Sequence, residues 1–232
     1  MPLARHLFAR SILTLSALGA GVGAHAADWV SYRDAYRAMV VFEKYGGPKQ
    51  QLQQHLQVLP LEKGVSIEGL QLTLAGKANQ VNLALDALGR TAFPLLKAAY
   101  DENAALYLSR QVGAFRVRPR VSLAPQADGV YDAAQLRAGC EQALGFARYV
   151  DASLRTRQCG GVRFVFARRG GGVAVRLHRP EGADQALAAV SGAAFPGEPD
   201  EGLPTVVYRF AGAERAQVIS ANVPLAIVPL FD

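Results

Sequence analysis

The sequence predicts a mainly β protein of the α+β class, with a β-sandwich preceded by a short helix and followed by an α+β C-terminal part. Three observations predict this architecture. Apolar and polar residues alternate between about residues 65 and 125, as in strands that bury one face. Apolar residues at helical spacing occur near residue 30 and in a longer segment after residue 130. Alternation returns after residue 160, so antiparallel strands are expected behind the longer helix.

Residues 1–26 predict a secretory signal peptide. Arg5 and Arg10 precede an apolar run of about a dozen residues, and Ala24 and Ala26 provide the small side chains that signal peptidase requires. The run is shorter than the ~20 residues that span a membrane. We therefore expect cleavage after Ala26, a periplasmic protein, and no transmembrane segment.

The segment 27–48 is predicted to hold the N-terminal helix. Its apolar face is expected to contain, at steps of three and four, the residues Trp29, Tyr32, Tyr36 and Val40. The sequence Gly-Gly-Pro at 46–48 is expected to end the helix. The next segment, 50–60, fits either a helix or a strand.

Residues 49–125 are predicted to form the β-sandwich domain. Turn-forming residues at 75–79 and 86–90 separate short alternating segments, and Pro119 is expected to divide the last two strands. The expected strands lie at 70–74, 81–85, near 91, and at 106–108, 115–117 and 121–123. Several short strands with polar turns are typical of a sandwich.

Residues 126–232 are predicted to form an α+β domain. Asp132 is placed as the N-cap of a helix. One face of this helix is expected to carry Leu136, Cys140, Leu144 and Ala147. A hairpin should follow at 162–177, and strands should complete the chain after residue 204. Residues 181–204 are rich in Ala, Gly, Pro and acidic residues and predict a surface loop.

Cys140 and Cys159 are the two cysteines of the chain, and we predict that they form a disulfide. A zinc site needs three or four ligands, and the mature chain adds only His55 and His178 to the two thiols. Redox-active cysteine pairs usually have two residues between them. A structural disulfide is geometrically possible, because the helix extends ~14 Å beyond Cys140 and the residues that follow it can cover that distance back to Cys159. Free thiols and a metal site are the alternatives.

Five segments of the mature chain carry a resemblance: YRDAYRAMVVFEKYG (32–46), LPLEKGVSIEGLQLTL (59–74), FPLLKAAYDENAALYLSR (93–110), RPRVSLAPQADGVYDAAQLRAGCEQAL (118–144) and CGGVRFVFA (159–167). Together they resemble a proteobacterial family of exported proteins whose domain has no assigned function. The resemblance implies export and brings no site residues with it. The segment LALDALGRTAFPLL (83–96) is similar to prealbumin- or immunoglobulin-like sandwich domains, which implies a scaffold.

Positive charge is concentrated in one part of the chain. The formal net charge is +6, and residues 110–179 contain 13 arginines, no lysine and four acidic residues. The predicted anion-binding residues are Arg116, Arg118, Arg120, Arg163 and Arg176. The first three would project from one face if their strand continued through Pro119, and arginine suits bidentate contacts to phosphate or carboxylate. The alternative is a solvated surface that pairs with the acidic segment 181–201.

These patterns predict a non-enzymatic periplasmic or envelope-associated binding protein that recognises an anionic envelope component. Peripheral contact with anionic lipid is expected, without nucleic acid, metal or cofactor, and no catalytic residue is assigned. The rival is a periplasmic hydrolase that uses a carboxylate pair, for which Asp86, Asp101 and Glu102 are the candidates. Acids that converge in a cleft would favour the hydrolase, and a basic face would favour binding.

Overall fold

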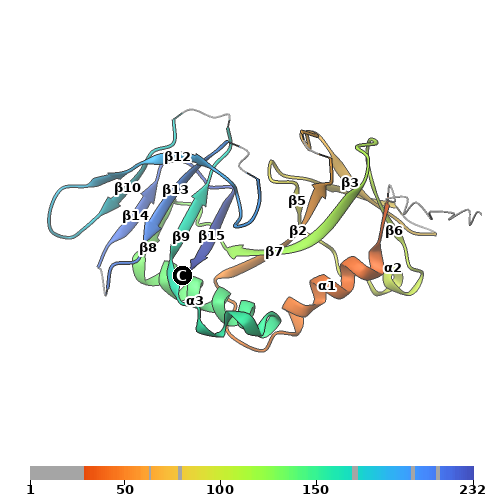
Figure 1. Cartoon of the computed structure of the whole chain (residues 1–232), viewed down its shortest axis with the longest axis horizontal. Coiled ribbons are helices and arrows are strands. Elements are labelled where there is room, and N and C mark those ends of the chain that lie inside the picture. Colours follow the sequence, from red (N-terminus) through yellow and green to blue (C-terminus); the bar gives the residue numbers. More distant parts are fainter. Residues whose placement is uncertain (1–28, 63, 78–79, 169–171, 200–201, 213–214) are drawn as a thin grey trace, which may run out of the picture.

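The computed structural model describes residues 29–62, 64–77, 80–168, 172–199, 202–212 and 215–232 (Figure 1). The expected signal peptide and its cleavage site lie outside the described residues. The helices are α1 (Tyr32–Lys44), α2 (Lys97–Asp101), α3 (Ala133–Val150) and the 3-10 helix η1 (Ala152–Thr156). The strands of the first half are β1 (Trp29–Ser31), β2 (Leu52–Pro60), β3 (Gln71–Ala75), β4 (Gln80–Ala84), β5 (Arg90–Thr91), β6 (Ala105–Leu108) and β7 (Phe115–Leu123). Those of the second half are β8 (Val130–Asp132), β9 (Cys159–Val165), β10 (Val175–His178), β11 (Gln185–Leu187), β12 (Ala189–Gly192), β13 (Leu203–Arg209), β14 (Gln217–Ser220) and β15 (Ala226–Phe231).

Over the described residues, the strands form three antiparallel sheets. The central sheet has the order β12-β13-β9-β15-β7-β2-β5. The N-terminal sheet has the order β1-β6-β3-β4, and the C-terminal sheet has the order β11-β10-β14-β8. The expected mainly β, α+β fold is confirmed, with α3 as its longer helix.

The central sheet covers two separate hydrophobic cores with one of its faces. In the first half, Leu56 of β2 packs with Leu72 of the N-terminal sheet and Met39 of α1. In the second half, Phe164 of β9 packs with Val218 of the C-terminal sheet and Leu144 of α3. Figure 1 shows α1 and α3 along the same side of the central sheet. Each half is therefore a sandwich of two sheets that is closed by a helix.

The central sheet also crosses residue 125, where the sequence divides the chain into two domains. Strand β7 of the first half pairs with β15 of the second half at Leu123 and Ile227. On the face away from the helices, a third cluster contains Leu88 of the first half with Phe195 and Val228 of the second. The two halves therefore share a sheet and a small core.

Helix α1 is shorter than the expected segment 27–48. Ser31 caps it, because its hydroxyl accepts a hydrogen bond from the N–H of Asp34. Trp29 was expected on the helical face, but it lies in β1 and the residue is 44% exposed. The buried face of the helix consists of Tyr32, Ala35, Met39 and Phe42. Trp29 has helical spacing to Tyr32, but the N-cap Ser31 lies between them, so the spacing wrongly placed Trp29 in the helix.

Pro119 does not divide two strands, as the sequence predicts, but lies inside β7. Its partner in β2 is Leu56, and β2 pairs with β7 over the full length of β7. The other neighbour, β15, pairs with β7 at Leu123 alone among the described pairs. One edge of β7 is thus open at Pro119, and a residue without an N–H is tolerated at an open edge. The segment 50–60, which fitted either structure, is mostly the long strand β2.

The expected surface loop at 181–204 contains two short strands, so that prediction is wrong in part. β11 pairs with β10, and β12 pairs with β13 at the edge of the central sheet. Both strands are short and mostly exposed. Hydrogen bonds to a neighbouring strand hold them, and composition alone does not reveal such bonds.

The predicted disulfide is confirmed. Cys140 of α3 and Cys159, the first residue of β9, are bonded, with their Cα atoms 6.0 Å apart. Both side chains belong to the core of the second half. No helix in the described part of the chain is long and apolar enough to cross a membrane.

Candidate functional site

Arginine side chains gather on the face of the central sheet that points away from α1 and α3. In β7, Phe115 and Val117 pack in the core of the first half, so the alternate residues lie on the opposite face. We call this set the arginine face, and it consists of Arg90, Arg116, Arg118, Arg120 and Arg163. Two strands of the first half, β5 and β7, and one of the second, β9, supply these residues.

Arg118 and Arg120 hold two oxygen atoms between them. Their Nε atoms both donate to Gln57 Oε1, at 3.2 and 2.7 Å. Their Nη2 atoms both donate to Glu198 Oε1, and the bond from Arg120 is 2.6 Å long. The Glu198 side chain is 9% exposed, whereas those of Arg118 and Arg120 are 29% and 18% exposed. Two guanidinium groups therefore bind a single carboxylate at the edge of solvent. For Arg118 and Arg120, the pairing with the acidic segment 181–201 that the alternative interpretation predicted is thus present.

The loop 193–199, which carries Glu198, touches other members of the arginine face. The ring of Phe195 lies under the guanidinium of Arg120, 4.4 Å from its central carbon, and 5.9 Å from that of Arg90. Arg163 Nη1 donates to the carbonyl of Ala193 at 2.9 Å. The Nε of Arg163 is buried and has no partner among the described residues.

Arg90 is the buried member of the face and was not singled out by the sequence. Its Nε and Nη2 donate to Asp86 Oδ2 at 2.9 and 2.7 Å, and Nη2 also donates to the carbonyl of Leu225. Asp86 Oδ1 accepts from the N–H groups of Leu88 and Arg90. The turn expected at 86–90 thus also holds an ion pair, for which the spacing of Asp86 and Arg90 was the available signal.

Positive charge exceeds negative charge on this face. Among the residues that the structure describes, its five guanidinium groups contact two carboxylates, Asp86 and Glu198. The guanidinium of Arg116 is exposed and forms no ion pair or hydrogen bond with a described residue. Burial lowers the pKa of Arg120 from its usual value, and Glu198 acts in the opposite direction. A further anion at the exposed side of the face would relieve this imbalance.

His55 lies opposite Arg120 in the β2–β7 pair and is half-buried beside the arginine face. Its Nδ1 is buried without a described partner. Burial lowers the pKa of His55, the positive charge of Arg90 lowers it further, and Asp86 opposes the shift. The folded protein therefore takes up this proton at lower pH than the unfolded chain does.

This difference predicts a pH-dependent stability. As the pH falls below about 6.5, the unfolded chain binds the proton first, so the free energy of unfolding should decrease by at most ~1.4 kcal/mol per pH unit. In His55→Gln this contribution should be lost, and the variant should depend less on pH between pH 7.5 and 5. Urea denaturation of both proteins across this range measures the slopes. Equal slopes would contradict the expectation.

Arg176, the fifth arginine predicted from the sequence, lies outside the arginine face. It belongs to β10 in the C-terminal sheet, and its Nε contacts Asp184 Oδ2 at 2.9 Å. Asp184 also contacts Nδ1 of His178 at 2.8 Å. The structure thus brings together Arg116, Arg118, Arg120 and Arg163 and places Arg176 in a separate exposed cluster.

The carboxylates of the rival hydrolase each have a different partner. Asp86 is bonded to Arg90, and Asp101 pairs with Lys97 on the exposed side of α2. Glu102 accepts a hydrogen bond from the backbone N–H of Lys77. Nothing in these contacts places two of the three acids around one site.

Comparison of the chain with family models, with curated proteins and with solved structures finds no match.

Proposed function

We propose that this chain is a non-enzymatic, envelope-associated binding protein of the periplasm, and that its arginine face recognises the phosphate of an anionic envelope lipid. The observation that carries the proposal is the excess of guanidinium groups over carboxylates among the described residues of this face, including the exposed Arg116, which has no ion pair with any of them. Arginine binds phosphate through planar, paired N–H groups, and several arginines on one face sum their attraction to an anionic surface.

Two further features support the location. The Cys140–Cys159 disulfide is of a kind that persists in oxidising compartments such as the periplasm. Arg5, Arg10 and the apolar run that follows them have the pattern of a secretory signal.

Binding to lipid vesicles tests the proposal. The mature chain, residues 27–232, should bind vesicles of equal parts phosphatidylcholine and phosphatidylglycerol better than phosphatidylcholine alone. Binding should weaken between low and physiological salt, because exposed charges are screened over ~8 Å at 0.15 M. Arg116→Glu should weaken binding to the anionic vesicles by about tenfold with an unchanged melting temperature, since the side chain is exposed and has no ion pair with a described residue.

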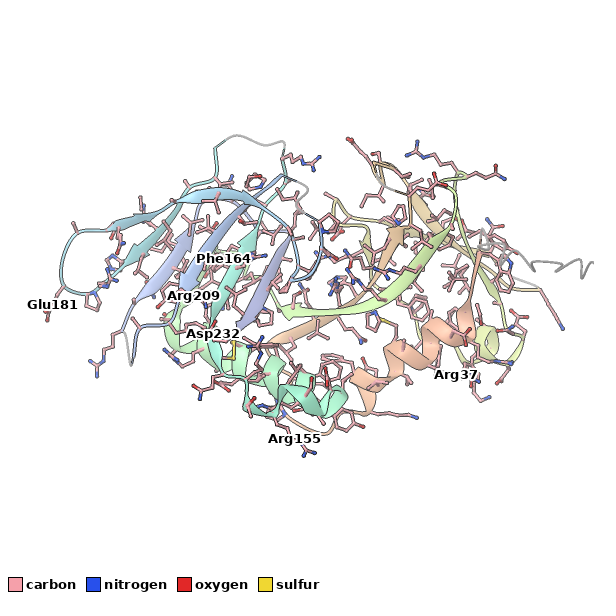
Figure 2. All side chains as sticks on the ribbon, viewed as in Figure 1. Arg37, Arg155, Phe164, Glu181, Arg209 and Asp232 are labelled. Atoms are coloured by element: carbon pink, nitrogen blue, oxygen red, sulfur yellow. A yellow bond between two sulfur atoms is a disulfide. The ribbon has the colours of Figure 1, made fainter. Side chains whose placement is uncertain are left out.

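Arg155→Glu is the matched control. Arg155 is also exposed, and Figure 2 shows it at the opposite, lower edge of the molecule near the end of α3. It should leave most of the binding intact. Equal binding to both vesicles would refute the lipid proposal, and binding to soluble peptidoglycan fragments instead would replace phosphate by carboxylate as the recognised group.

A further inference from the structure

The two halves of the chain repeat one order of elements. In the first half, β1 runs directly into α1, and β2, the pair β3–β4, β5, β6 and β7 follow. In the second half, β8 runs directly into α3, and β9, the pair β10–β11, β13, β14 and β15 follow. The N-terminal sheet, β1-β6-β3-β4, and the C-terminal sheet, β8-β14-β10-β11, have the same order of corresponding strands. Helix α2, helix η1 and strand β12 are additions to this plan.

The residue pairing of corresponding strands also agrees. Five pairs of opposite residues, one from each strand pair of the first half, have counterparts in the second half. Val30–Leu106 corresponds to Tyr131–Val218, Leu74–Leu106 to Leu177–Val218, Leu72–Leu83 to Val175–Leu187, Gln57–Arg90 to Arg163–Val207, and Leu56–Pro119 to Val162–Pro229. The two strand prolines, Pro119 and Pro229, therefore occupy equivalent positions. Shared order could arise by convergence, but the shared register of five strand pairs is a stronger sign of common origin.

The two longer helices correspond residue by residue. Positions 101 residues apart are buried in both: Tyr32 and Ala133, Ala35 and Leu136, Met39 and Cys140, and Phe42 and Ala143. The first N–H of each helix donates to the carbonyl just before a corresponding strand, at Ala104 before β6 for α1 and at Ala216 before β14 for α3, both at 2.9 Å. Both helices thus join their sheets in the same way.

A pseudo-two-fold axis relates the halves. The strands on either side of the central, antiparallel β7–β15 pair follow in mirrored order, β7-β2-β5 and β15-β9-β13. On the helix side, Tyr45 and Phe146 are equivalent, since each lies 13 positions after the first residue of its helix. Their rings touch, with centroids 5.4 Å apart. Contact between equivalent residues is expected at a two-fold axis.

We infer that the chain is an internal duplication, and that β7 of the first repeat supplies arginines to the anion-binding site where its copy, β15, is apolar. This assignment of the site rests on the proposed function. The duplication supplies an internal reference for each arginine of β7, because the second repeat shows what the same fold places there.

The second repeat fills the equivalent positions with apolar residues. By register, the counterparts of Arg116, Arg118 and Arg120 are Ala226, Val228 and Leu230. Ala226 and Val228 are 0% and 3% exposed and pack with Phe195 in the small core of this face. The fold therefore does not require arginine in this strand. Arg118 and Arg120 are partly buried, and burying arginine costs desolvation energy, so their presence in the first repeat indicates a binding role.

A repeat-matched variant tests the inference. It carries Arg116→Ala, Arg118→Val and Arg120→Leu, together with Glu198→Ala, because the Glu198 carboxylate would otherwise lose both its cations. It lowers the net charge by two, as does the control Arg155→Ala/Arg157→Ala at two exposed arginines elsewhere. Melting temperature and binding to phosphatidylglycerol-containing vesicles are measured for both variants and the wild type.

We expect the repeat-matched variant to melt within about 5 °C of the wild type and to lose binding by at least about tenfold, whereas the control keeps it. A misfolded variant, or one that melts much lower, would show that the arginines belong to the scaffold and would overturn the inference. Retained binding would overturn the assignment of the site to the first repeat. Absence of binding by the wild type would instead refute the proposed function, and the melting temperatures would still test whether the fold accepts the residues of its second copy.

Discussion

Asp86→Ala is expected to lower the free energy of unfolding by about 3–5 kcal/mol, because it leaves a buried guanidinium without its carboxylate. Arg90 is 3% exposed, and two of its nitrogen atoms donate to Asp86 Oδ2. The carboxylate also holds the turn through the N–H groups of Leu88 and Arg90. Urea denaturation of the mature protein measures the change, and the melting temperature should fall by roughly 10 °C.

Asp101→Ala is the matched control among the acids that the sequence offered for catalysis. Its ion pair with Lys97 is exposed, with side-chain exposures of 56% and 82%, so its loss should change stability by less than about 0.5 kcal/mol. Asp86→Asn retains hydrogen-bond acceptor capacity and should cost less than Asp86→Ala. Equal stabilities of the Asp86→Ala and Asp101→Ala variants would contradict a buried structural pair at Arg90.

The parts of the fold that local patterns determine could be predicted from the sequence. Alternation identified the hairpin of β3 and β4, because one face of each strand must be apolar. Helical spacing identified α3 and placed Cys140 on its buried face. The disulfide could be predicted from the separation of the two cysteines in the sequence and from the distance that the residues between them can cover. In each case, the signal lies within about 20 residues of the element that it describes.

Features that depend on distant partners could not be predicted in this way. Pro119 predicts a strand break, because the sequence does not show that β15 leaves that edge of β7 open. The sequence places Glu198 in an acidic loop. In the structure, its carboxylate binds Arg118 and Arg120, which lie about 80 residues earlier in the chain. The repeat is also hidden from the sequence, because the two copies share burial and register at positions such as Met39 and Cys140 rather than residue identity.

The sequence predicted the members of the arginine site only in part, for a related reason. Parity along one strand was sufficient to group Arg116, Arg118 and Arg120, once the strand proved continuous. Parity carries no information about which sheet a strand joins, so Arg176 could not be separated from Arg163 by sequence. Strand order, which long-range packing decides, made that distinction.

Removing the disulfide is the second change with a large expected effect. Cys140 and Cys159 are 19 residues apart, and a closed loop of this length stabilises by roughly 3 kcal/mol through the lost freedom of the unfolded chain. The cross-link joins the middle of α3 to the start of β9, two elements that pack in the same core. Reduction of the wild type should therefore lower the melting temperature by about 6–12 °C, as should Cys140→Ala/Cys159→Ala without reductant.

Reductant separates this effect from a general weakening of the protein. The double alanine variant has no disulfide to lose, so its melting temperature should be the same with and without reductant. Thiol titration of the denatured, unreduced wild type should find no free thiol, because both cysteines are bonded. Two titratable thiols, or a wild type that melts at one temperature in both conditions, would show that α3 is held on β9 by packing alone.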